Sequence, residues 1–181
     1  MKKIFLFALC LLFLFSGCAA NGNWDALELA RRDAATDASI PAQHVAVALS
    51  PASDLQGLEM TFTVTGDSPS VTVAIYQAEK DYDTTLSGKP LREKTFSRLT
   101  EKVLWQFRSL PAGDYLIVFS DLSAATLTKS VVPSDEANGK ILHYRNGEVM
   151  TDGTPVLTLL CGKNGEEKPK LVTFSYPVPE E

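Results

Sequence analysis

The chain has 181 residues and carries 17 basic against 22 acidic side chains, a formal net charge of −5. A net negative charge repels the phosphate backbone of nucleic acid, which argues against nucleic acid as a partner. The hydrophobic content of 45% is enough for a globular core.

The beginning of the chain has the parts of an export signal. Residues 1–3 supply a charged start, residues 4–15 form an apolar run, and two small residues precede Cys18. An apolar run of this length is too short to span a bilayer as a helix. We therefore expect residues 1–17 to be a signal peptide that is removed.

The segment Phe15-Ser16-Gly17-Cys18 resembles the lipobox of bacterial lipoproteins. This resemblance implies cleavage after Gly17, a diacylglyceryl thioether on Cys18 and acylation of the new amino group. Two or three acyl chains hold a protein lastingly, because each buried methylene contributes about 0.8 kcal/mol. Ala19 resembles the residue that sorts lipoproteins to the outer membrane, so we expect a lipid-anchored envelope protein, at the outer membrane if the cell has one. The alternative is a secretory signal cut near Ala19 or Ala20, which would leave a soluble exported protein.

Removal of the signal changes both the charge and the cysteine count. The signal holds two of the 17 basic residues, so the mature net charge is −7, and membrane contact is expected through the lipid and not through a basic face. With Cys10 removed and Cys18 lipidated, Cys161 is the single free thiol, which excludes an intrachain disulfide and a thiolate metal cluster. Within the apolar run 156–161, Cys161 is predicted to be a small core residue; a reactive thiol is the alternative.

Residues 18–42 are expected to form a lipidated tether, because they are rich in Ala, Asn and Asp. Trp24, Leu27 and Arg31 recur at helical spacing. A short helix over residues 24–35 is therefore the alternative to an extended tether.

Residues 43–176 contain short β-rich runs separated by turn residues, with no long helix between them. In 60–65 and 70–75, apolar and small polar residues alternate, as strands with one buried face require. Their number and regular spacing favour one antiparallel sandwich domain, and residues 177–181 are predicted to be a solvated tail. The expected strands are 43–49, 57–65, 70–77, 91–97, 102–108, 113–120, 126–132, 140–145, 155–161 and 170–176.

Two turns are predicted from their residues. Gly66-Asp67-Ser68-Pro69 predicts a hairpin loop between the strands that flank it. Asn146-Gly147 favours a primed turn, because both central residues of that turn take a positive φ.

The segment Leu110-Pro111-Ala112-Gly113-Asp114-Tyr115 resembles a corner motif of prealbumin-like sandwiches, which include carboxypeptidase regulatory-like and collagen-adhesin repeats. The resemblance covers residues 58–132 and implies an all-β, antiparallel Greek-key β-sandwich of the prealbumin-like or immunoglobulin-like kind. It implies a fold and no activity.

Physical expectations accompany this motif. Gly113 would permit a tight start to the strand, and Tyr115 would pack inward while its hydroxyl reaches a turn carbonyl. Ile117 and Phe119 would share the face of Tyr115. The neighbouring strand would be supplied by residues 104–107, which contain Trp105 and Phe107.

Catalytic motifs are not found, so we expect neither an enzyme nor a cofactor. The sequence has no Gly-x-Ser-x-Gly elbow and no His-Glu-x-x-His motif. His44 and His143 are predicted to be structural or solvent-facing. Asp81 and Asp83 are candidate calcium ligands, since clustered carboxylates offer hard oxygen atoms, but an ordinary hydrated loop is favoured there and no metal is expected.

Three functions remain open. The leading one is a membrane-anchored, non-catalytic binding or assembly module, whose sheet edges and loops at 78–90 and 133–140 recognise an envelope protein. The second function is a more specific assembly role, that of a type VI secretion lipoprotein, which is a transthyretin-like assembly protein. A strand of that family resembles the segment Val71-Thr72-Val73-Ala74-Ile75-Tyr76-Gln77.

The third function is glycan or small-ligand binding. Tyr82, Tyr144 and Tyr176 are the candidate ligand-binding residues, because exposed rings on one face would form a stacking platform; core filling is their alternative role. Coplanar exposed rings would favour the glycan, whereas a bare, uncharged edge strand would favour a protein partner.

Overall fold

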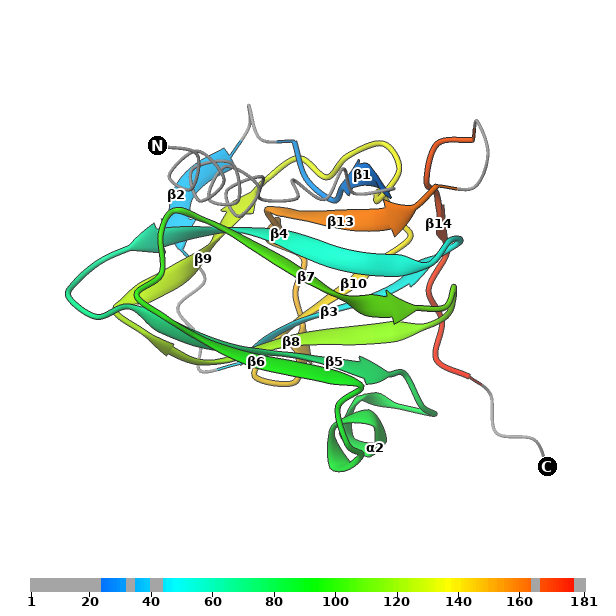
Figure 1. Cartoon of the computed structure of the whole chain (residues 1–181), viewed down its shortest axis with the longest axis horizontal. Coiled ribbons are helices and arrows are strands. Elements are labelled where there is room, and N and C mark those ends of the chain that lie inside the picture. The colour runs from blue at the N-terminus through cyan, green and yellow to red at the C-terminus, as the bar shows by residue number, and fades with distance from the viewer. Residues whose placement is uncertain (1–23, 32–34, 40–43, 164–166, 178–181) are drawn as a thin grey trace, which may run out of the picture.

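The chain folds into two antiparallel β-sheets that face each other, as expected for an all-β sandwich (Figure 1). The computed structural model describes residues 24–31, 35–39, 44–163 and 167–177, with the backbone alone described at 35–39. Gly17 and Cys18, and with them the expected signal, lie outside the described residues.

The first sheet is built around a long strand, β4. Strand order is β1-β13-β4, after which β7 pairs with the first half of β4 and β9 with its second half. Both β2 and β12 pair with β9. The bounds are β1 Trp24–Glu28, β2 Ala35–Ser39, β4 Leu55–Val64, β7 Lys102–Leu110, β9 Ala125–Ser130, β12 Thr154–Pro155 and β13 Leu157–Gly162.

The second sheet has the order β11-β10-β3-β8-β5-β6, and β14 pairs with the end of β3. The bounds are β3 Val45–Pro51, β5 Ser70–Gln77, β6 Arg92–Ser97, β8 Tyr115–Ser123, β10 Leu142–Arg145, β11 Glu148–Val149 and β14 Leu171–Val172. The strands expected between 43 and 161 are thus confirmed, with ends displaced by a few residues.

Strands β3 and β8 are buried on both faces. In β8, Tyr115, Ile117 and Phe119 point into the core between the sheets, as expected, while Leu116 and Val118 belong to a second apolar cluster. Two buried faces explain why these strands are continuous apolar runs and do not alternate. The outer face carries the helix α2, Tyr82–Ser87, and the segment 173–177 after β14.

The helix over 24–35, which was the alternative to an extended tether, is wrong. Residues 24–28 form β1, which pairs antiparallel with β13 and places Leu27 opposite Leu159. Leu27 and Leu29 are both buried, which is the period of two of a strand and not helical spacing. Part of the expected tether, Trp24–Glu28, is therefore a strand of the first sheet.

The hairpin expected at 66–69 is wrong as well. The two strands that flank this loop, β4 and β5, belong to different sheets, and the loop crosses between them. Turn residues specify a reversal of the chain, but they do not say to which sheet it returns. The Asn146-Gly147 turn is confirmed, with φ of 50° and 87°, between the paired residues Arg145 and Glu148.

In the corner motif, Tyr115 is placed as expected, but Gly113 and the strand that contains Trp105 and Phe107 are not. The Tyr115 side chain is 1% exposed, and its hydroxyl donates to the Pro111 carbonyl. Gly113 has no positive φ, and an added Cβ would lie 3.7 Å from the Tyr115 hydroxyl, so glycine is not required for a tight start. Trp105 and Phe107 lie on β7, which pairs with β4 in the other sheet and not with β8.

Candidate functional site

The three candidate tyrosines lie together on the outer face of the second sheet. The ring centroids of Tyr82 and Tyr144 are 4.6 Å apart with an interplanar angle of 34°. Tyr176 lies edge-on to Phe174, 5.0 Å between centroids. All four belong to, or pack against, the second apolar cluster, whose floor is Ala46, Ala48, Leu116 and Val118. The three tyrosines named from the sequence are thus brought together, although they come from three separate elements: α2, β10 and the C-terminal segment.

This arrangement fills space between the sheet, the helix and the C-terminal segment. Tyr144 is only 4% exposed, and the rings are tilted and not coplanar. Burial raises the pKa of the Tyr176 hydroxyl. Sugars stack on flat, exposed rings, so the geometry gives glycan binding no support.

The acidic group before α2 starts the helix. An Asp81 side-chain oxygen accepts from the Thr84 N–H at 2.7 Å, and this bond lowers the pKa of the Asp81 carboxyl. Asp81 is therefore the N-cap residue, which satisfies a helix-end donor. Asp83 lies exposed in the first turn. Within the described ranges, no group of three His, Cys, Asp or Glu side chains could hold a metal ion.

The two histidines have different surroundings. His44 is exposed, and its backbone N–H donates to the Asn146 side-chain oxygen at 3.1 Å. His143 lies half-buried on β10, where it lines a small cavity of about 170 Å³ together with Ile141 and Thr154. Burial lowers the pKa of His143, which favours the neutral ring.

Cys161 is fully buried on β13, and burial raises the pKa of its thiol to about 11. Because the thiolate is the reactive form, we predict that Cys161 in the folded protein reacts at pH 8 with a thiol reagent about 100-fold more slowly than in urea. Absorbance of the released thiol product would measure this rate. Equal rates in both conditions would assign Cys161 to an accessible site.

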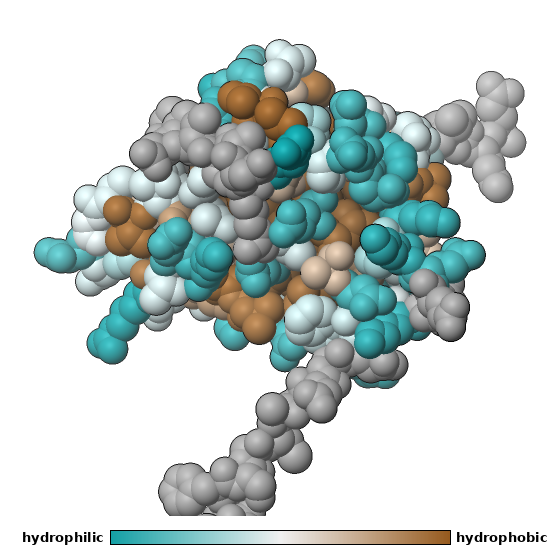
Figure 2. Space-filling view, turned by 90° about the horizontal axis from the view of Figure 1, so that it is seen from above, coloured by the Kyte–Doolittle hydropathy of each residue, from teal (hydrophilic) through white to brown (hydrophobic). Residues whose placement is uncertain are grey.

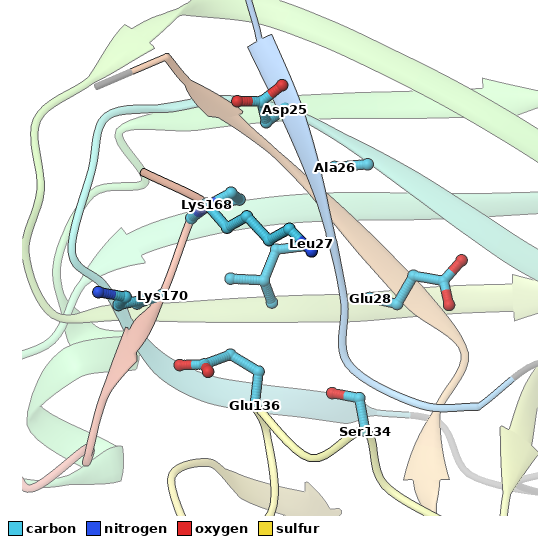
Figure 3. A pocket seen from close by; sticks show the side chains of 9 residues that line it. Asp25, Ala26, Leu27, Glu28, Ser134, Glu136, Lys168 and Lys170 are labelled. Carbon is cyan, nitrogen blue, oxygen red and sulfur yellow. The ribbon is translucent and has the colours of Figure 1, made fainter. Parts of the chain in front are cut away.

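A groove lies between β1 and the segment 168–170 (Figure 3). It has a volume of about 660 Å³. Figure 3 shows Lys168 extending toward β1 beside Leu27, with Glu136 below. Glu136 accepts from the Lys140 ammonium at 2.6 Å and from the Leu171 N–H at 2.8 Å, and these bonds lower the pKa of its carboxyl. The Glu136 carboxylate thus binds the backbone of the C-terminal segment. The groove is lined by both acidic and basic side chains, and this mixture does not define a reaction centre.

The face seen from above in Figure 2 carries hydrophobic areas separated by hydrophilic side chains. No helix among the described residues is long and apolar enough to cross a bilayer.

The edges of the two sheets differ at β6 and β7. Strand β6 ends the second sheet and carries the alternating charges Arg92, Glu93 and Lys94. Strand β7 pairs with β4 alone among the described strands, and its residues 103–107 are uncharged. Charges protect an edge from pairing with another chain. Of the two, β7 is the unprotected edge.

A side chain joins these two edges at one end. The Arg92 guanidinium donates to the Arg108 carbonyl from two nitrogens, at 3.2 and 2.9 Å. Farther along, Trp105 packs edge-on against Phe96 and Phe107, with ring centroids 5.9 and 4.9 Å away. These contacts join β7 to β6 in the other sheet.

Comparison with protein-family models, with curated proteins and with solved structures gives no match.

Proposed function

We propose that the protein is a lipid-anchored cell-envelope lipoprotein that acts as a non-catalytic binding or assembly module. The observation that carries this proposal is the segment Phe15-Ser16-Gly17-Cys18 after a charged and apolar start, followed by a domain of two packed sheets. Its anchor is the acylated Cys18, and Ala19 supports sorting to the outer membrane of a cell that has one. Its partner is another envelope protein.

The sandwich is of the Greek-key, prealbumin-like kind. The corner formed by Tyr115 and the Pro111 carbonyl supports this proposal. So does the path of the chain, which alternates between the sheets from β3 through β5 and again from β6 through β10. This fold carries no activity by itself, which agrees with a binding role.

A short distance separates the anchor from the domain. Trp24, the first residue of β1, follows Cys18 by six residues. Six residues span at most about 20 Å, so the lipid would hold the β1 side of the domain next to the bilayer.

The anchor is tested by the intact mass of the protein extracted from its native membrane. We expect a mass equal to residues 18–181 plus a diacylglyceryl group and an amide-linked acyl chain. The Cys18→Ala variant is the control, and it should lose the lipid mass and partition away from the membrane, because a thioether needs the sulfur. A native protein of unmodified mass in the soluble fraction would refute the proposal.

A further inference from the structure

The outer edge of β7 presents backbone groups that no other described strand pairs. The Phe62 N–H of β4 donates to the Glu101 carbonyl at 2.8 Å. Val103 and Trp105 lie two and four residues after Glu101, so their backbone N–H and C=O groups also point at β4. Residues between them point the opposite way, because backbone direction in a strand alternates. Leu104 and Gln106 therefore direct their N–H and C=O groups away from the sheet.

Contacts at the two ends of β7 agree with this direction. The Lys102 carbonyl accepts from the Thr100 hydroxyl at 2.7 Å, and the Arg108 carbonyl accepts from Arg92. Lys102 and Arg108 lie an even number of residues from Leu104, so their carbonyls point in the same direction as that of Leu104. Each of these two carbonyls accepts a hydrogen bond from a residue outside the first sheet. The Leu104 side chain is 53% exposed.

The region 92–108, which we call the basic flank, has a charge opposite to that of the chain. It contains five basic residues against two acidic ones, a local net charge of +3, in a chain of net charge −5. Two of the basic residues, Lys102 and Arg108, bracket the uncharged centre of β7. A complementary partner is therefore acidic, and it would be drawn to this flank and repelled elsewhere.

The position of the flank distinguishes a protein partner from the membrane. In the first sheet, β1 and β7 lie on opposite sides of β13 and β4 (Figure 1). Three strand spacings separate them by about 14 Å. Since the proposed anchor precedes β1, β7 is the strand on this path that lies farthest from the anchor, which favours a protein partner over anionic headgroups.

We infer that the β7 edge is a strand-addition site for an extended, acidic segment of a partner protein. The segment adds beside β7, bonds the outward groups of Leu104 and Gln106, and places its carboxylates near Lys102 and Arg108. Main-chain bonds supply the affinity and the flanking charges supply the preference for an acidic sequence. This inference rests on the proposed binding function and names its site.

The test is photocrosslinking in cells that express the full chain from its native locus. A benzophenone amino acid replaces Gln106, which is exposed at the middle of the edge. Adducts are digested and mapped by mass spectrometry. We expect a crosslink to a partner segment in which Asp and Glu outnumber Lys and Arg.

The proline variant Leu104→Pro removes one outward N–H and no bond to β4, so it should fold and lower the adduct yield about tenfold. Val149→Pro is the matched control. Val149 is 58% exposed on the edge strand β11, and the Met150 N–H bond to His143 shows that the Val149 N–H points out of its hairpin. This control should leave the yield unchanged.

A second pair of variants keeps the test independent of proline. Arg108→Glu should also reduce the yield, while Lys163→Glu, at an exposed position outside the basic flank, should not. Crosslinks to lipid, to a second copy of this chain or to a segment without acidic excess would overturn the inference, and so would an adduct that survives Leu104→Pro.

Two further measurements on the same samples distinguish a failure of the β7 site from a failure of the proposed function. Intact mass reports the anchor, and a second crosslinker at Asp83 reports partners that bind through the loop at 78–90. A partner captured from Asp83 but not from Gln106 overturns the β7 site and leaves the binding module standing. A loss of the acyl mass with a retained Gln106 crosslink overturns the anchor alone.

Discussion

Replacing Gly57 with alanine should destabilise the domain by about 2–3 kcal/mol, within the range of overpacked cores. Gly57 lies in β4 between β7 and β13. A Cβ at this position would lie 2.6 Å from the Trp105 carbonyl oxygen and 2.9 Å from a methyl group of Leu160. The Trp105 oxygen is backbone and cannot move aside without shifting β7 relative to β4. Urea unfolding of the unlipidated chain, in a Cys18→Ala background, would measure the loss.

Gly113→Ala is the matched control for this change. Its added Cβ would meet no atom closer than 3.7 Å, and Gly113 has no positive φ. Both substitutions stiffen the unfolded chain to the same extent, so their difference isolates the clash in the folded state. We expect Gly113→Ala to change the free energy of unfolding by no more than about 0.5 kcal/mol. Equal stability of the two variants would show that β7 does not lie against Gly57.

The strands were predictable where the pattern is local. Residues 70–77 alternate, and they form β5 with the same bounds. The Asn146-Gly147 turn was predictable because its two residues are the ones that accept the required φ. In each case a few neighbouring residues contain the whole signal.

Pairing partners could not be predicted in the same way. The helical spacing of Trp24 and Leu27 is real, but β13 offers β1 a partner more than 100 residues away, and burial of Leu27 and Leu29 in the core outweighs helix propensity. The loop at 66–69 likewise gives no sign of the sheet to which β5 belongs. Both errors concern contacts between distant parts of the chain.

The candidate site shows the same limit. The uncharged residues 103–107 between Lys102 and Arg108 are visible in the sequence, but they are also what a central strand would have. Their meaning depends on strand order, which makes β7 an edge. The tyrosines were named correctly as a group of interest, but the burial of Tyr144 and the packing of Tyr82 and Tyr176 against the second apolar cluster follow from tertiary contacts alone.

Replacing Phe174 with alanine should cost about 3 kcal/mol, at the lower end for a buried phenylalanine. Phe174 is 6% exposed, packs on the second apolar cluster and lies edge-on to Tyr176. Its N–H donates to the Lys140 carbonyl at 2.8 Å, so the backbone of the segment is fixed and cannot slide into the cavity. Urea unfolding followed by near-ultraviolet circular dichroism would report both the stability and the packing of the tyrosines.

Val172→Ala is the control on the same segment. Val172 is 57% exposed, so its truncation should change the free energy of unfolding by no more than about 0.5 kcal/mol. If both variants had the stability of the original chain, the C-terminal segment would be a removable cover over Tyr82 and Tyr144, and ligand binding at these rings would regain support. A large cost confined to Phe174 would instead make the rings part of the domain's core and leave the sheet edges as its recognition surface.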